Sequence, residues 1–399
     1  MIEASIGKKT VRDIEVAGKR VLLRADLNVP LADGAVADDT RIRESLPTLV
    51  YLLDQGARVI VCSHLGRPKG VDSSLSLAPV AGRLANLLDR EVILAPDCVG
   101  PETAAVIADA PEGAVVLLEN LRFHPEEEAN DAAFAAALSV LADVYVNDAF
   151  GAAHRAHAST EGVAHLLPAV AGLLMEKEVQ YLSALVADPP RPFAAVVGGA
   201  KVSSKIAAIN HLLPKIDILI VGGGMANTFL KATGVNVQAS LVENEQVEVA
   251  RAILTAAGGR GIDVHLPTDV VCADRFAADA RVAVVPADSV PEGFTILDIG
   301  PQTVGLYAEA LRKAKAVIWN GPMGVFEFPA FARGSFAMAR TIAALSAVTV
   351  VGGGETAQVV ADAGVTDQIT HVSTGGGASL EMLEGRVLPG VAALLDSDA

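Results

Sequence analysis

A glycine-rich segment near the C-terminus carries residue types that could bind phosphate. From Ala347 to Ala357 the sequence reads AVTVVGGGETA, an apolar run followed by three glycines, Glu355 and Thr356. The pattern predicts a buried strand that leads into a helix start. Free N–H groups of a first helical turn and a threonine hydroxyl can hold phosphate oxygens, and a neighbouring carboxylate can hold a metal ion.

The same segment has two other interpretations. Gly352, Gly354 and Ala357 fit the dinucleotide fingerprint G-x-G-x-x-G/A, which would make the protein a nicotinamide-dependent oxidoreductase. That fingerprint needs a ribose-binding acid about 20 residues further on, and the stretch from His371 to Gly377 offers none. A glycine-rich strand end can also be a tight turn without a ligand.

Further glycine-rich segments follow apolar runs in the second half of the chain. They are GGAK (Gly198 to Lys201), GGGM (Gly222 to Met225), NGPMG (Asn320 to Gly324) and TGGGAS (Thr374 to Ser379). Such segments can form backbone nests for a polyphosphate. Lys201 is expected to open a helix, with Lys205 one turn later. Either lysine could be a point charge on a transferring phosphoryl group, or both could be solvated helix residues.

The first half of the chain instead places cations and polar side chains after its apolar runs. They are Arg24, Asp26 and Asn28 in RADLNVP, His64 and Arg67 in SHLGRP, Arg122 in LENLRFH, and Arg155 beside His154 and His157, with Arg41 at an expected helix start. Each arginine alone could form an ordinary ion pair. Together they indicate a bidentate clamp for phosphate and carboxylate. The two histidines lack a third metal ligand at suitable spacing, so helix-start or domain-contact roles are preferred for them.

The elements that position these residues alternate between strand and helix. Expected strands are 20–25, 57–63, 91–96, 114–119 and 143–148 in the first half, and 193–197, 216–221, 295–299, 314–319 and 347–351 in the second, with helices such as 40–55 and 77–90 between them. The alternation predicts parallel α/β sheets covered on both faces. Ligands of such sheets bind at the carboxyl ends of the strands.

Length and composition indicate two domains in one chain. With 399 residues, the chain is longer than a domain with one hydrophobic core usually is. The segment after Gly172 has helix-like spacing up to Pro189 and Pro190. We therefore expect two doubly wound, Rossmann-like domains, 1–171 and 188–385, joined by a helix over 172–187.

Charge and cysteine content narrow the class of protein. The net charge of −16 disfavours a nucleic-acid or anionic-membrane partner. Cys62, Cys98 and Cys272 are far apart and are expected to be buried small hydrophobes in a reducing compartment. The N-terminus has no apolar signal core and no long apolar run occurs, which favours the cytoplasm. Neither a G-x-x-x-x-G-K-[ST] loop nor the H-R-D and D-F-G kinase motifs are present.

A cationic site in one domain and glycine-rich phosphate sites in the other suggest phosphoryl transfer, and the motifs that carry these sites closely resemble the phosphoglycerate kinase family. In order, the matching segments are KRVLLRADLNVPL, SHLGRP, LENLRFHPEEEAN, VNDAFGAAHRAHAS, LLMEKEVQYL, VVGGAKVSSKI, LIVGGGMANTFL, WNGPMGVFE and STGGGASLEMLEGRVLPGV. The resemblance runs essentially end to end. It implies reversible phosphoryl transfer between 1,3-bisphosphoglycerate and ADP in glycolysis, with Mg²⁺, by a monomer whose domains close over the substrates.

The resemblance also implies roles for individual residues. The 3-phosphoglycerate site would comprise Asp26, Asn28, Arg41, His64, Arg67, Arg122 and Arg155. The nucleotide site would comprise Lys201, Lys205, Gly222, Gly223, Asn320, Glu327, Gly353, Gly354, Glu355 and Thr356. Arg41, Lys201 and the N–H groups from Gly375 to Gly377, centred on Gly376, would neutralise charge on the moving phosphoryl group. The C-terminal tail, from about residue 386, would pack on the N-terminal domain.

One residue departs from the family pattern. The family usually has aspartate where this chain has Glu355, the expected metal ligand. Glutamate keeps the charge but adds a methylene, and Mg²⁺ demands near-ideal octahedral geometry. To accommodate the longer side chain, either the backbone shifts slightly, a water lies between the carboxylate and the metal, or the metal preference is altered. A further hypothesis is that the protein binds nucleotide but does not turn it over. Glu355 is the only feature of the sequence that suggests this.

Overall fold

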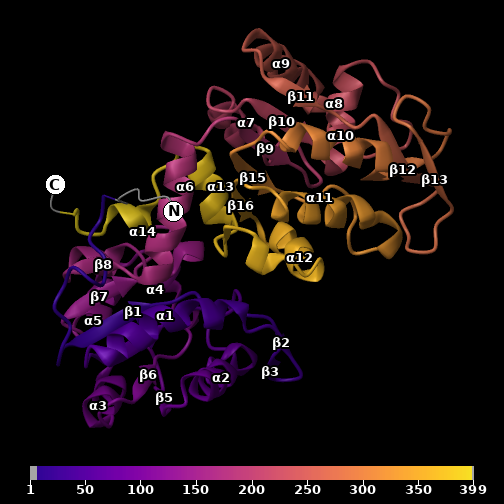
Figure 1. Cartoon of the computed structure of the whole chain (residues 1–399). Helices are drawn as coiled ribbons and strands as arrows, with labels where there is room; N and C mark the ends of the chain where they lie inside the picture. The colour runs from indigo at the N-terminus through magenta and orange to yellow at the C-terminus, as the bar shows by residue number, and fades with distance from the viewer. Residues whose placement is uncertain (1–6, 398–399) are drawn as a thin grey trace. The chain divides into compact units, whose positions relative to one another are not determined.

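The computed structural model describes residues 7–397 and divides into two compact units (Figure 1). Unit 1 comprises Met1–Gln180 and Val387–Ala399, and unit 2 comprises Tyr181–Arg386. The chain passes between them first within helix α6 (Leu173–Ala187) and then after Arg386. The C-terminal segment belongs to unit 1, where the Leu395 N–H donates to the Ala169 carbonyl at 2.9 Å.

Unit 1 is built on a six-stranded parallel sheet. The first strand, β1, lies inside the sheet, and later strands are added on both sides of it. The order is β5 (Val92–Leu94), β6 (Val115–Leu117), β4 (Arg58–Cys62), β1 (Arg20–Arg24), β7 (Val144–Asn147) and β8 (Ala169–Ala171). Its helices are α1 (Thr40–Asp54), α2 (Ala78–Leu88), α3 (Pro101–Asp109), α4 (Pro125–Glu128), α5 (Ala132–Ser139) and α14 (Pro389–Ala392), and β2 (Leu31–Ala32) pairs with β3 (Ala35–Val36). Because crossovers are right-handed, reversing the direction of strand addition puts helices on both faces.

Unit 2 repeats this plan. Its parallel order is β11 (Asp263–His265), β10 (Ile218–Val221), β9 (Phe193–Val197), β15 (Ala316–Asn320), β16 (Val348–Gly352) and β17 (His371–Val372). The helices are α7 (Ile206–Leu212), α8 (Gly223–Ala232), α9 (Val247–Gly259), α10 (Pro301–Leu311), α11 (Arg333–Ala343), α12 (Gly354–Asp362) and α13 (Gly377–Leu383). The prediction of doubly wound parallel sheets is confirmed for both main sheets.

The expected strand 295–299 forms but lies outside the parallel sheet. As β14 (Thr295–Ile299) it pairs antiparallel with β12 (Asp269–Ala273), which also pairs antiparallel with β13 (Val282–Pro286). The connection from β12 to β13 is too short for a helical crossover, which explains why β13 returns antiparallel to β12. Strand β14 lies on the other side of β12 in this separate three-stranded sheet. Placing 295–299 among parallel strands was therefore wrong.

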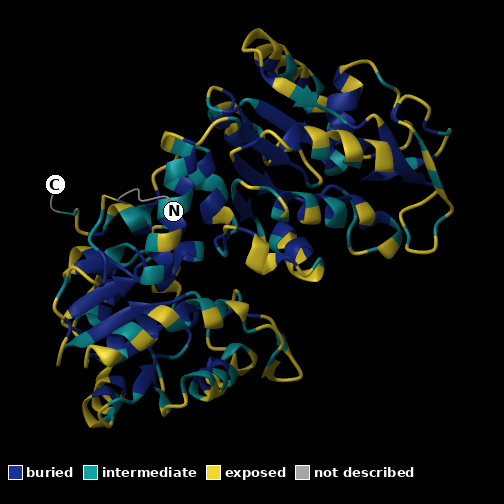
Figure 2. Ribbon diagram, viewed as in Figure 1, coloured by how far each residue is buried: buried dark blue, intermediate teal, exposed yellow. Residues whose placement is uncertain are grey.

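Burial follows the expected two-sided pattern of the sheets. Figure 2 shows the central strands as buried and the outer sides of the helices as exposed. Strands β9 and β15 are buried at every residue, which explains their continuous apolar sequence. No helix within residues 7–397 is both long and apolar enough to cross a membrane.

Candidate functional site

Four arginines of unit 1 converge on His64, which follows β4. The His64 side chain is buried, and burial lowers its pKa well below 6.5. The positive charges of Arg24, Arg122, Arg41 and Arg155 lower the same pKa further. These groups come from different segments: Arg24 ends β1, Arg41 lies in the first turn of α1, Arg122 in the turn after β6 and Arg155 after β7. The sheet thus gathers a cationic site around a neutral imidazole.

Arg41 is held at this site by the loop that follows β1. Its Nη1 donates to the Asn28 carbonyl at 2.9 Å and to Asp26 Oδ1 at 3.3 Å. Asn28 Oδ1 in turn accepts from the Gly66 N–H at 2.8 Å, which ties this loop to the one that carries His64. The Arg41 side chain is 36% exposed, so its remaining donors can reach a ligand.

The other arginines differ in how many of their guanidinium N–H groups are bonded to the protein. Arg122 is buried; its Nη1 donates to the Gly66 carbonyl at 2.6 Å and its Nε lies 3.2 Å from Glu128 Oε1. Burial lowers the Arg122 pKa despite that carboxylate. Arg155 Nε donates to His154 Nε2 at 3.1 Å. Arg67 is exposed, and within the described residues its guanidinium has neither a hydrogen bond nor an ion pair.

A buried hydrogen-bond chain behind His64 was missing from the predicted site. Arg24 Nη2 donates to His64 Nδ1 at 3.0 Å, and Arg24 Nε donates to Ser159 Oγ at 2.8 Å. Ser159 Oγ donates to Glu127 Oε1 at 2.6 Å. Since Nδ1 accepts, this network assigns the ring proton to Nε2. The position of Arg24 at a strand end was visible in the sequence, but the pairing of Ser159 with Glu127 spans segments that only the fold brings together.

The buried, neutral state of His64 predicts how stability depends on pH. The unfolded chain takes up this proton near the ordinary pKa of 6.5, whereas the folded chain does so only at much lower pH. The His64 contribution to the free energy of unfolding is therefore complete above the unfolded-state pKa of 6.5 and declines as pH falls below that value. We expect the stability difference between wild type and His64→Gln to shrink from about pH 7.5 to about pH 5.5.

Urea unfolding at each pH measures this difference, and the NMR shifts of the His64 ring report its protonation directly. A His64 ring that titrates near its ordinary pKa in the folded protein would contradict the assignment.

His154 and His157 do not open a helix. They lie in the turns between the short 3₁₀ segments Phe150–Ala152 and Gly162–His165. His157 Nδ1 lies 3.9 Å from Glu127 Oε1, and burial together with neighbouring arginines lowers the His157 pKa to about 4. The helix-start role is therefore wrong, because the chain here folds into turns.

In unit 2, polar groups meet at the carboxyl ends of β15 and β16. Lys205 donates from Nζ to Asn320 Oδ1, and Asn320 ends β15. Burial lowers the pKa of Lys205, although the negative charges of Glu355 and Glu384 act to raise it. Thr356 is buried, and its hydroxyl accepts from the Gly321 N–H at 2.7 Å, which leaves its own hydrogen to donate.

Lys201 does not open a helix. Helix α7 begins at Ile206, and Lys201 is an exposed residue in the turn before it. The Ser203 N–H and hydroxyl donate to Glu243, which holds this turn in a non-helical conformation. Lys201 thus projects from a loop at the end of β9, whereas Lys205 is the partly buried lysine.

The glycines at two strand ends allow backbones to touch instead of forming anion nests. The Gly222 N–H donates to the Val197 carbonyl at 2.8 Å and the Gly223 N–H to the Met323 carbonyl at 3.0 Å, so neither is free for phosphate. A Cβ on Gly223 would lie 2.6 Å from the Gly199 nitrogen. The nest interpretation is wrong for these two residues, because close packing of the loops after β9, β10 and β15 uses their N–H groups.

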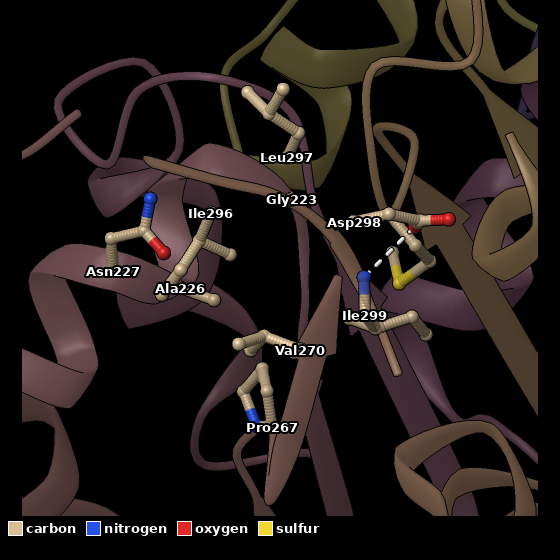
Figure 3. Close-up of a pocket in the computed structure, with 10 residues that line it drawn as sticks. Gly223, Ala226, Asn227, Pro267, Val270, Ile296, Leu297, Asp298 and Ile299 are labelled. Carbon is tan, nitrogen blue, oxygen red and sulfur yellow. Dashed lines mark hydrogen bonds between the residues drawn. The ribbon is translucent and has the colours of Figure 1, made fainter. Parts of the chain in front are cut away.

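Figure 3 shows a small cavity beside Gly223, lined also by Asn227, Leu297 and Asp298. Asp298 is buried, and burial raises its pKa to about 7. Its Oδ2 accepts from the Gly334 N–H at 2.8 Å at the start of α11. The cavity is about 10 Å³, room for about one water, so it is not a nucleotide pocket.

The segment from Gly353 to Thr356 retains the features of a phosphate site. Gly353 is the N-cap of α12 with φ of 93°, and the first N–H groups of this helix have no acceptor within it. Glu355 lies exposed in the first turn, and within the described residues its carboxylate accepts no hydrogen bond. An exposed carboxylate beside a phosphate site fits Mg²⁺, which keeps several waters and binds through few protein oxygens.

Two further predicted residues occupy separate loops of unit 2. Gly376 is the N-cap of α13 with φ of 45°, and the N–H of the preceding Gly375 donates to Ser373 Oγ at 3.1 Å. Of the three expected N–H donors there, Gly375 is therefore already engaged. Glu327 is exposed in the turn after Gly324.

The chain is similar to known proteins along nearly its whole length. The phosphoglycerate kinase family model matches residues 11–386. The phosphoglycerate kinase of Pelotomaculum thermopropionicum is 59% identical over 392 residues, which cover 98% of this chain and 100% of the relative. The cytosolic phosphoglycerate kinase of Triticum aestivum is 56% identical over 390 residues, covering 96% and 97%. The solved phosphoglycerate kinase from Coxiella burnetii matches with a TM-score of 0.87 and 41% identity, covering 97% and 98% of the two chains. The chain belongs to the phosphoglycerate kinase family.

Proposed function

We propose that the protein catalyses reversible phosphoryl transfer between 1,3-bisphosphoglycerate and ADP, giving 3-phosphoglycerate and ATP. The observation that carries this proposal is the convergence of Arg24, Arg41, Arg122 and Arg155 on a neutral His64. Such a site suits a small molecule with phosphate and carboxylate groups, because guanidinium groups bind both in bidentate fashion. Family membership supplies the identity of the substrates.

We assign the 3-phosphoglycerate site to unit 1 and the nucleotide site to unit 2. In unit 1, Arg67, Arg122 and Arg155 would bind the substrate's anionic groups, and His64 would donate from Nε2. Asp26 and Asn28 would hold Arg41, as their contacts indicate. Because Arg24 is fully buried and bonded to His64 and Ser159, we assign it a positioning role.

In unit 2 we assign the nucleotide phosphates to Lys201, Lys205, Asn320 and the start of α12. Gly353, Gly354 and Thr356 would contact phosphate oxygens through N–H and hydroxyl donors. Gly222 and Gly223 would support a wall of the site, because their missing Cβ atoms let the loops after β9, β10 and β15 pack closely. Glu327 is assigned to the nucleotide site as an exposed acceptor.

Catalysis in this proposal consists of positioning and charge neutralisation. The attacking carboxylate of 3-phosphoglycerate is ionised near neutral pH, so no side chain has to remove a proton. Arg41, Lys201 and the N–H of Gly376 would neutralise the charge on the phosphoryl group in line between donor and acceptor. Bound Mg²⁺, held by Glu355, would neutralise phosphate charge as well. The two substrate sites must come together and exclude water, so we propose domain closure before transfer.

A coupled assay with purified protein, ATP, Mg²⁺ and 3-phosphoglycerate tests the proposal. We expect ADP to form only when 3-phosphoglycerate is present. ADP formation without dependence on 3-phosphoglycerate, or none at all from folded protein that binds nucleotide, would contradict it.

Glu355 as the metal ligand gives a separate prediction. Glu355→Gln removes the charge but keeps the length, so we expect at least about a tenfold rise in the Mg²⁺ concentration needed for half-maximal activity, in the range seen when a metal site loses a supporting group. Glu309→Gln on the surface of α10 is the control and should leave the Mg²⁺ dependence unchanged. An unchanged Mg²⁺ titration in Glu355→Gln would remove this residue from the metal site.

We further propose that the protein is a cytoplasmic monomer. The cytosolic Triticum relative supports the compartment. Gel filtration with light scattering would test the monomer, and a mass of twice 41.0 kDa would contradict it.

A further inference from the structure

Asp97, Cys98 and His124 form a compact group of metal-ligating side chains at the carboxyl edge of the unit 1 sheet. Asp97 and Cys98 follow β5, and His124 follows the 3₁₀ turn Leu121–Phe123 after β6. One ligand atom from each lies within 4.8 Å of the others. None of the three belongs to the cationic substrate site, and neither phosphoryl transfer nor nucleotide binding explains why they meet.

The distances within this group are close to those of a metal coordination shell. His124 Nε2 lies 2.7 Å from Asp97 Oδ1, and Cys98 Sγ lies 3.6 Å from the same oxygen. Neighbouring ligands in a tetrahedral zinc site, with bonds of about 2.0 to 2.3 Å, lie roughly 3 to 4 Å apart. All three ligand atoms lie within 4.8 Å of one another, so side-chain movements on the order of 1 Å would place an ion among them.

Surrounding contacts hold Asp97 and His124 in place. The Thr103 hydroxyl donates to the Asp97 carbonyl at 3.1 Å, and the Cys98 N–H donates to Asp97 Oδ1 at 2.6 Å. The ring of Phe134 packs on His124 with centroids 5.1 Å apart. Such supporting contacts orient metal ligands in known sites.

Access and chemistry favour one class of ion. Cys98 is buried, but the side chains of His124 and Asp97 are 28% and 46% exposed, so an ion can enter from solvent. A thiolate with an imidazole selects zinc-like divalent ions over Mg²⁺, which prefers oxygen ligands. Three protein ligands leave a fourth position for water.

We propose that Asp97, Cys98 and His124 bind one Zn²⁺-like ion. Burial and the Asp97 carboxylate raise the pKa of the Cys98 thiol, so the metal-free thiol holds its proton. On binding, the S–H proton is released to solvent and a sulfur–metal bond forms, with no change of oxidation state. The ion would join the loops after β5 and β6, and the second of these loops also carries Arg122.

Cobalt(II) titration of the full-length, reduced and chelator-treated protein tests the proposal, because only a thiolate ligand gives the intense near-ultraviolet charge-transfer band. Without nucleotide or phosphate present, we expect one Co²⁺ per chain with this band, displaced by one equivalent of Zn²⁺. Cys98→Ser should abolish the band, and His124→Gln should weaken binding by at least about tenfold.

Matched controls separate this site from others on the same chain. Cys272→Ser removes a thiol from unit 2, and His165→Gln removes another histidine paired with a carboxylate, Glu161. Both should keep the band and the affinity. Asp97→Asn gives a second test should Cys98→Ser fail to fold, as judged by circular dichroism. Absence of the band in wild type, or an equal band in folded Cys98→Ser, would overturn the proposal.

Discussion

Arg41→Ala is expected to lower kcat/KM for 3-phosphoglycerate and ATP by at least about two orders of magnitude. Removal of one preorganised group that neutralises transition-state charge typically has an effect of this size. Arg41 meets the requirement for preorganisation, because Nη1 is fixed by the Asn28 carbonyl and Asp26 while the rest of the guanidinium remains available. Steady-state kinetics of the forward and reverse reactions would measure the loss.

Arg43→Ala is the matched control for this experiment. Arg43 lies on the same helix, but its Nε pairs with Asp39 Oδ1 at 2.9 Å and its side chain is 54% exposed. An exposed pair of this kind contributes little to stability, about 1 kcal/mol or less, and no direct effect on catalysis is expected. If Arg41→Ala were as active as Arg43→Ala, Arg41 would have no part in the transition state.

Gly198→Ala is expected to destabilise unit 2 by at least about 2 kcal/mol, as overpacking against atoms that cannot move aside does. A Cβ at Gly198 would lie 2.3 Å from the Pro322 carbonyl oxygen and 2.6 Å from the Gly321 carbonyl oxygen. Both are backbone atoms, so the loops after β9 and β15 would have to separate. Lys201 lies in the first of these loops and Asn320 directly precedes the second, so activity should fall together with stability.

Urea unfolding followed by Trp319 fluorescence measures the effect, because this buried residue of β15 is the chain's only tryptophan and reports on unit 2. Gly305→Ala is the control. Gly305 lies inside α10 with nothing near its Cβ position, so alanine should stabilise by about 0.5–1 kcal/mol. Equal stability of Gly198→Ala and wild type would show that these loops adjust freely.

Most strands of the two main sheets were predictable because burial on both faces requires continuous apolar runs, whereas the short edge strands β8, β11 and β17 were missed. Phe193–Val197 shows this directly: every residue is buried and the sequence FAAVV has no alternation. The sheet around β12 was not predictable in the same way. Its strands lie in a separate antiparallel layer, and the exposed, alternating pattern of β13 depends on which neighbour covers it.

For the candidate site, the sequence indicated which residues stand at strand ends but not how they are bonded. His64, Arg41 and Arg122 were expected at one site, and the charges of both arginines do act on the buried, neutral His64 ring. The chain through Ser159 and Glu127 was missed because it depends on contacts between distant segments. Gly222 and Gly223 were misread because a glycine that binds phosphate and a glycine that lets backbones touch have the same sequence signal.

The measurement that tests the central claim most directly is chemical trapping of the reaction product. Purified wild-type protein with ATP, Mg²⁺ and 3-phosphoglycerate should form an acyl phosphate, which hydroxylamine converts to a hydroxamate that mass spectrometry identifies. We predict hydroxamate formation that requires 3-phosphoglycerate, equals the ADP released, and falls by at least about two orders of magnitude in Arg41→Ala. ADP release by folded protein without any hydroxamate would contradict transfer to the carboxylate.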